Sequence, residues 1–231
     1  MKIGTITTGQ SPRIDIILEL KEAIGFEVEI VERGVFDNLT RKEIINLDYR
    51  QDDYTMVVRM RDGEQIKVAE RHIIEGVKKC IADLERIEVD LIILLCTGKF
   101  PKEITSNKLF LKPNKLIENI VESMPQDGVM AVIVPLLEQI PLIEQKWKIT
   151  NPNQKAIFDA VSPYTGTDDE IKKVAERIAK TDANLVILDC VGYNKRVKTV
   201  FQKVTKKPIL LPSTLLGRIA GELICGGFNK Y

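Results

Sequence analysis

Residues 89–98 read Val-Asp-Leu-Ile-Ile-Leu-Leu-Cys-Thr-Gly, and residues 183–192 read Ala-Asn-Leu-Val-Ile-Leu-Asp-Cys-Val-Gly. Each stretch is an apolar, largely branched run between polar residues, which is typical of a strand buried on both faces of a parallel sheet. Cys96 and Cys190 stand where the runs end and a Cys-x-Gly turn begins. Ligands bind at the carboxyl ends of strands in open α/β sheets. We therefore expect the two thiols to face one small molecule as an acid/base pair.

The composition indicates a soluble globular protein without an affinity for nucleic acid or membranes. The chain has 231 residues, 44% of them hydrophobic, and 34 basic against 33 acidic side chains. Its longest uncharged apolar runs are shorter than the ~20 residues of a membrane span. Residues 3–8 suggest a strand rather than a secretory signal. The four cysteines form no Cys-x-x-Cys pair, so the sequence predicts a cytoplasmic protein with free thiols.

Strand and helix patterns alternate along the first half of the chain, which favours βα units around a parallel sheet. Ser11 is expected to cap a helix opened by Pro12, and Asp62-Gly63 to form a hairpin turn. The predicted elements are strands at 2–7, 26–31 and 109–111, a β-hairpin at 54–60 and 65–68, a helix at about 70–86, and a helix that begins at Pro113. The hairpin is an insert that could cover an edge or contact another subunit.

The second half repeats this plan. Its predicted elements are strands at 128–134, 156–161 and 208–211, helices at 136–147 and 168–180, and a last helix capped by Ser213. The fold class is therefore α/β, with two pseudo-symmetric lobes of mainly parallel sheet, at 1–125 and 126–231, and a ligand cleft between them. Exchange of a segment between the lobes is left open, and one continuous sheet is the competing architecture.

Several short segments of the sequence resemble AroM family proteins. They are Gly4-Thr-Ile-Thr-Thr-Gly-Gln-Ser-Pro12, the 128–135 strand followed by Gln145-Lys-Trp147, and Leu188-Asp-Cys-Val-Gly-Tyr193 with the trailing Arg196. That family in turn resembles the aspartate/glutamate racemase superfamily, which includes hydantoin racemases, arylmalonate decarboxylases and maleate isomerases. The resemblance implies that Cys96 and Cys190 match the first and second catalytic cysteines of hydantoin racemases. The amino-acid racemases usually carry Cys-Asn-Thr and Cys-Thr at these sites, whereas this chain has Cys-Thr-Gly and Cys-Val-Gly.

Racemisation beside a carboxylate needs a base on one face of the carbon and an acid on the other. Cysteine suits both roles because its ordinary pKa, near 8.5, lies close to neutrality. A helix N-terminus just past each Cys-x-Gly turn would favour the thiolate. Backbone, hydroxyl and cationic groups near the predicted strand ends are candidates to bind the carboxylate and the enolate. These candidates are Thr7, Thr8, Arg13, Thr97, Gly98, Gly192, Tyr193, Arg196, Ser213 and Thr214.

The sequence predicts no cofactor and no metal. It contains a single histidine, His72, and has no phosphate-binding loop and no dinucleotide fingerprint. The expected partner is a small carboxylate-bearing molecule, and a homodimer is expected on general grounds. Three functional hypotheses remain open: a racemase with two active thiols, a decarboxylase or cis–trans isomerase with one, and a non-catalytic binding or regulatory protein. Buried cysteines also serve as small apolar core residues.

Overall fold

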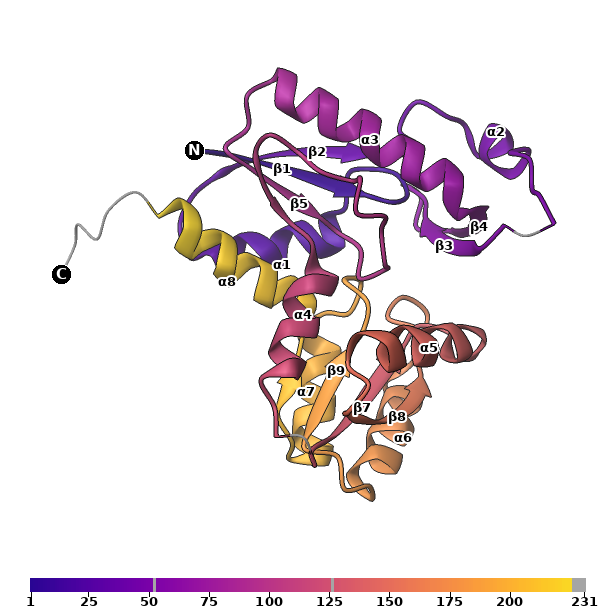
Figure 1. The fold of residues 1–231 in the computed structure, drawn as a ribbon, viewed down its shortest axis with the longest axis vertical. Coiled ribbons are helices and arrows are strands. Elements are labelled where there is room, and N and C mark those ends of the chain that lie inside the picture. Colours follow the sequence, from indigo (N-terminus) through magenta and orange to yellow (C-terminus); the bar gives the residue numbers. More distant parts are fainter. Residues whose placement is uncertain (52, 126, 226–231) are drawn as a thin grey trace.

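Two four-stranded sheets, each wholly parallel, form the centre of the computed structural model (Figure 1). The structure describes residues 1–225 except 52 and 126. The first sheet has the order β2-β1-β5-β6, with β1 (Lys2–Thr7), β2 (Glu29–Gly34), β5 (Leu91–Leu94) and β6 (Leu109–Leu111). The second has the order β10-β9-β7-β8, with β7 (Val129–Val134), β8 (Lys155–Ala160), β9 (Leu185–Leu188) and β10 (Ile209–Leu210). The predicted fold class, α/β with mainly parallel sheets, is confirmed.

The two sheets repeat one arrangement. In each, the first strand of the half (β1 or β7) lies between the second strand and the strand that precedes the cysteine. All four residues of β5 are buried, as are three of the four in β9. Burial on both faces explains why these runs are continuously apolar instead of alternating. The duplicated sequence therefore brings both cysteine strands to equivalent places.

Helices connect the strands and cover the sheets. They are α1 (Ile14–Ile24), α2 (Arg41–Ile45), α3 (Glu70–Arg86), α4 (Pro113–Glu122), α5 (Ile140–Thr150, after a 3₁₀ turn at Leu137–Gln139), α6 (Asp168–Ala179), α7 (Lys195–Thr205) and α8 (Pro212–Ile224). Two predicted caps are wrong. Arg13 is the N-cap of α1, because the Ser11 hydroxyl donates to Asp37 instead. Leu211 is the N-cap of α8, with Pro212 as its first residue and Ser213 inside the helix.

Each half sends its last helix to the other sheet. Ile117 and Val121 of α4 pack with β7 and β9 in one buried cluster. Leu216 and Ala220 of α8 pack instead with α1, β1 and β5. Figure 1 shows α8 beside α1, although they come from opposite ends of the chain. The boundary expected near residue 125 stays a prediction, but these contacts show that the two sheets share helices.

The hairpin β3 (Thr55–Arg59) and β4 (Gln65–Ala69) forms a separate two-stranded antiparallel sheet. It is held against the carboxyl end of β1, where the Gln10 N–H donates to the Arg59 carbonyl at 3.0 Å. Gly9 makes this approach possible, since a Cβ there would lie 2.0 Å from the Arg59 oxygen. The hairpin therefore lies over strand ends of the first sheet. Its predicted contact with another subunit stays untested.

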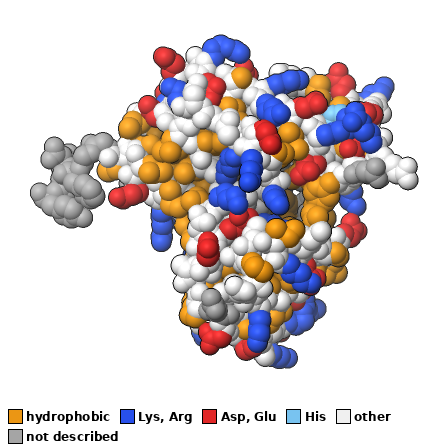
Figure 2. Space-filling model, viewed as in Figure 1, with side chains coloured by type: hydrophobic (Ala, Val, Ile, Leu, Met, Phe, Trp, Pro, Cys, Tyr) orange, Lys and Arg blue, Asp and Glu red, His pale blue; other side chains and the backbone are white. Residues whose placement is uncertain are grey.

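The surface carries both signs of charge. Figure 2 shows lysine and arginine side chains interspersed with aspartate and glutamate over one face, while apolar side chains gather where α8 lies. This pattern agrees with the net charge of +1. Within residues 1–225, leaving aside 52 and 126, no helix combines the length and the apolar character needed to cross a membrane.

Candidate active site

Cys96 and Cys190 line the same cavity, which has a volume of about 110 Å³. Each cysteine lies two residues beyond its strand, β5 or β9, and each is half-buried. The cavity is small beside the ~300–1,000 Å³ of pockets that hold drug-sized ligands. Its walls come from the strand ends of both sheets and from the β3–β4 hairpin. The structure thus brings the two sequence-predicted thiols together at one site.

The two Cys-x-Gly turns have the same local geometry. The Gly98 N–H donates to the Cys96 sulfur at 3.4 Å, and the Gly192 N–H donates to the Cys190 sulfur at 3.4 Å. A backbone donor stabilises the ionised form of a thiol more than the neutral form. Glycine is also needed for space at 192, where a Cβ would lie 2.1 Å from the Tyr164 hydroxyl oxygen. The second glycine therefore keeps Tyr164 close to Cys190.

Burial raises the pKa of both thiols in the ligand-free site. For Cys96 the pKa rises to about 12, because desolvation and the neighbouring Cys190 and Asp189 outweigh the Gly98 N–H and Lys146. Burial also raises the pKa of Cys190, but the Gly192 N–H, Arg13 and Tyr164 oppose the shift. Neither Cys-x-Gly turn leads directly into the expected helix N-terminus. The described segment between Cys96 and β6 contains no helix. After Cys190, the next helix is α7, which begins only at Lys195.

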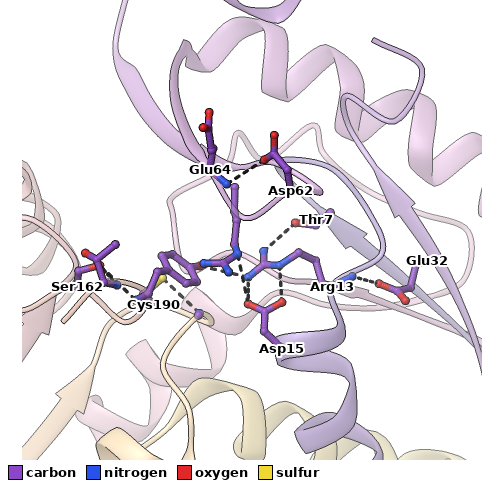
Figure 3. A network of polar contacts seen from close by, with 12 residues as sticks. Thr7, Arg13, Asp15, Glu32, Asp62, Glu64, Ser162 and Cys190 are labelled. Carbon is purple, nitrogen blue, oxygen red and sulfur yellow. Dashed lines mark hydrogen bonds and ion pairs between the residues drawn. The ribbon is translucent and has the colours of Figure 1, made fainter. Parts of the chain in front are cut away.

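Arg13 reaches the cavity from the start of α1 with a side chain that is only 6% exposed. Its guanidinium donates twice to the Asp15 carboxylate, at 2.9 and 2.8 Å, and once to the Thr7 hydroxyl at 3.2 Å. A fourth hydrogen bond, at 3.2 Å, runs to the Tyr164 hydroxyl. Figure 3 shows this network between Asp15, Thr7 and the Cys190 turn. Arg13 is therefore fixed in place beside the second thiol.

A second cation contacts the same aromatic ring. The Arg59 guanidinium of β3 lies 4.2 Å from the centre of the Tyr164 ring and 3.9 Å from Asp15. Arg59, Arg13 and Tyr164 all line the cavity. Burial raises the pKa of the Tyr164 hydroxyl, which therefore stays protonated at neutral pH. Two arginines around one aspartate leave this side of the cavity with excess positive charge, which suits a carboxylate.

A buried ion pair connects the two cysteine turns. Lys146 of α5 lies 3.1 Å from the Asp189 carboxylate, and the two side chains are 7% and 0% exposed. The Lys146 ammonium also donates to the Thr97 carbonyl at 3.2 Å, while the Thr97 hydroxyl donates to the Asp189 carbonyl at 3.1 Å. The Trp147 indole donates to the same carboxylate at 3.3 Å. The residues adjacent to each cysteine are therefore fixed to one another across the cavity.

The other sequence-predicted residues fall into two groups. The cavity is lined by Thr8, Arg13, Thr97, Gly98 and Gly192. The remaining five lie elsewhere. Thr7 accepts a hydrogen bond from Arg13, and Tyr193 is buried with its hydroxyl donating to the Val161 carbonyl. Arg196 pairs with Asp168 at the surface, while Ser213 and Thr214 lie in the first turn of α8.

Several polar residues at this site were not among the predicted site residues. Lys146, Tyr164, Arg59 and Tyr54 come from α5, the loop after β8, and the hairpin with the residue before it. Lys146 and its partner Asp189 each had a signal, because each lies in a sequence segment that carries the family resemblance. The others are single polar residues in segments whose position over the cavity depends on tertiary packing. Within the described part of the chain, no group of three or more His, Cys, Asp or Glu side chains could hold a metal ion.

Comparisons with known proteins place this geometry in context. The model of the family described as AroM protein matches residues 3–224. No curated protein sequence matches the chain. The structure is similar to an allantoin racemase from Klebsiella pneumoniae, with a TM-score of 0.64 and 11% identity over 97% of this chain and 88% of the other.

Two further solved structures share the fold. A maleate isomerase from Pseudomonas putida S16 has a TM-score of 0.60 and 11% identity, covering 97% of this chain and 93% of its own. An aspartate racemase from Picrophilus torridus has a TM-score of 0.54 and 13% identity, covering 96% and 94%. At such low identity these likenesses establish a racemase-like fold and no more.

Proposed function

This chain belongs to the AroM family, and we propose that it is a cofactor-independent isomerase of the racemase type that acts on a small carboxylate-bearing metabolite. The observation that carries the proposal is the pair of thiols, Cys96 and Cys190, on the walls of one small cavity. The fold shared with an allantoin racemase and a maleate isomerase supports it at the level of the superfamily.

In the proposed reaction, the sulfur of one cysteine removes the proton from the carbon beside the carboxylate. The other thiol donates its own proton to the opposite face, so that one thiolate is consumed and one is formed. The electron pair passes onto the carboxylate as an enolate between these two steps. Arg13 and the neighbouring donors would stabilise that negative charge, because they are fixed before the reaction begins.

The electrostatics of the site favour one thiolate at a time. Cys190 has Arg13 and the Tyr164 hydroxyl beside it, both of which lower its pKa against the effect of burial. An ionised Cys190 in turn raises the pKa of Cys96. Interacting groups of this kind lose their protons in two separate steps. We therefore assign Cys190 as the first base and Cys96 as the first acid, which is the charge state that the reaction requires.

Hydrogen exchange at carbon tests this proposal. We expect the protein in D₂O to exchange the α-proton of at least one member of a pool of amino acids, hydantoins and small hydroxy and dicarboxylic acids, as followed by NMR. Cys190→Ser and Cys96→Ser should each lower the rate at least 100-fold. Cys225→Ser is the matched control, because Cys225 is exposed and outside the cavity. Full exchange in both active-site variants would rule out thiol catalysis.

A second candidate function is ligand binding without turnover. The raised pKa of both thiols in the empty cavity favours it, because neither is a ready nucleophile at neutral pH. A binding protein would be stabilised by its ligand, with a higher melting temperature and no α-proton exchange. Exchange that depends on Cys190 would exclude this alternative.

A further inference from the structure

A second hollow of about 400 Å³ lies next to the cysteine cavity, between the β3 side of the hairpin and α5. Its walls are mainly apolar and include Tyr54, Met56, Leu142, Ile143 and Ile149. Four residues, namely Tyr54, Met56, Gly98 and Ile143, line both hollows. The hollow, called here the hairpin–α5 recess, therefore begins where the Cys96 side of the cavity ends.

We propose that the hairpin–α5 recess is a substrate subsite, and that the substrate is a carboxylate whose reacting carbon carries an apolar substituent of about the size of a phenyl ring. This inference rests on the proposed function, since it places the reacting carbon between the two thiols. The carboxylate lies toward Arg13 and Arg59, and the substituent extends past Met56 into the recess.

The polarity of the walls supports this orientation. Arg13, Arg59 and the Tyr164 hydroxyl surround the Cys190 side of the cavity. On the Cys96 side, the walls shared with the recess are two apolar side chains, one aromatic ring and a glycine. A molecule that satisfies both sides has one anionic end and one apolar end. The cavity alone, at about 110 Å³, leaves little room for the second group.

Met56 lies at the boundary of the two hollows. Its terminal carbon lies 3.3 Å from the place where a Cβ on Gly98 would stand, so glycine leaves room for it beside Cys96. Methionine has three rotatable bonds and adapts to irregular spaces. Its side chain can therefore move aside for a substituent without displacing the β3 backbone. The charged residues of the recess are Glu70, Lys99 and Lys146, and the last is already engaged by Asp189.

Calorimetric titration with matched acids tests the subsite. Lactate and mandelate differ only in a methyl or a phenyl group on the reacting carbon, as do alanine and phenylglycine, while malate carries a polar group of intermediate size. Burial of a phenyl ring should make mandelate and phenylglycine bind at least tenfold more tightly than lactate and alanine. Malate should gain less than mandelate, because the walls next to the cysteine cavity are apolar and the charged side chains of the recess include Glu70 as well as Lys99.

Two variants and one control locate the effect. Leu142→Gln and Ile149→Gln should each reduce the preference for mandelate over lactate at least fivefold, with lactate affinity unchanged, because both residues line the recess and lie outside the cysteine cavity. Leu137→Gln is the control, since Leu137 is 69% exposed and lies outside the recess. Equal binding of lactate and mandelate, tighter binding of malate, or a preference unaffected by both variants would each overturn the subsite alone. If none of the five acids binds, the subsite proposal fails, and the α-proton exchange experiment separately decides the proposed function.

Discussion

At the scale of single residues, two cysteines in the same local turn have different surroundings. Each sulfur accepts one N–H bond from its own glycine. Asp189 raises the pKa of both thiols. Cys190 also adjoins Arg13 and Tyr164, which lower its pKa, whereas Cys96 has only Lys146 as a neighbouring charge that lowers its pKa, and Cys190 itself raises it. The repeated sequence thus provides two equivalent thiols, and the residues around them make their acidities unequal. This inequality is the basis on which we propose Cys190 as the base and Cys96 as the acid.

The pH dependence of alkylation measures that inequality. Because the pKa of both thiols is raised, iodoacetamide should label neither appreciably at pH 7 in the ligand-free protein, and each rate should rise about tenfold per pH unit below its pKa. Cys190 should become reactive at lower pH than Cys96, whose pKa is about 12. Mass spectrometry of the labelled peptides resolves the two, with exposed Cys225 as internal reference. Faster labelling of Cys96 would reverse the assignment.

At the scale of elements, a close backbone contact at Gly9 helps to hold the hairpin against the first sheet, together with the bonds from Arg61 to Gln10 and Ser11. Gly9→Ala would place a Cβ 2.0 Å from the Arg59 oxygen, so β3 must move away from the end of β1. We expect a loss of about 1–3 kcal/mol in unfolding free energy, and weaker turnover because Met56 and Arg59 move with the strand. Hydrogen exchange at the Gln10 amide, which bonds Arg59, should accelerate.

Gly63→Ala is the matched control for this effect. Gly63 lies in the turn of the same hairpin with a φ of 91°, so alanine there costs conformational energy but meets no backbone atom. The Gln10 amide should keep its protection in that variant. Equal loss of protection in both variants would mean that the hairpin is not held at Gly9.

Much of this element structure is predictable from the sequence, and the exceptions have physical causes. The hairpin and the cysteine strands stand out because turn residues and apolar runs are local signals. The second strand lies at 29–34 instead of 26–31, since it is an edge strand rich in charged residues. The short α2 was not predicted, although Thr40 and Glu43 form a capping box. Tyr164 and Arg59 reach the site through packing between segments that are distant in the sequence. Local sequence patterns do not predict such contacts.

At the scale of the whole molecule, the exchanged helices make the two sheets depend on each other. Leu216 of α8 is fully buried against the first sheet, whereas Trp147, the only tryptophan, is buried with α4 in the cluster of the second. Because α4 and α8 also contact one another, loss of packing at one sheet should also destabilise the other sheet. The chain should therefore unfold in one cooperative transition despite its two sheets.

Leu216→Ala tests this coupling. Truncation of a buried leucine should lower the unfolding free energy by about 3 kcal/mol. In urea, the Trp147 fluorescence midpoint should fall together with the circular-dichroism midpoint, although Leu216 and Trp147 lie in different clusters. Leu223→Ala, on the same helix but 47% exposed, should change the free energy by less than about 0.5 kcal/mol. If the Trp147 midpoint stays fixed while the circular dichroism shifts, the two halves unfold separately and the exchanged helices do not couple them.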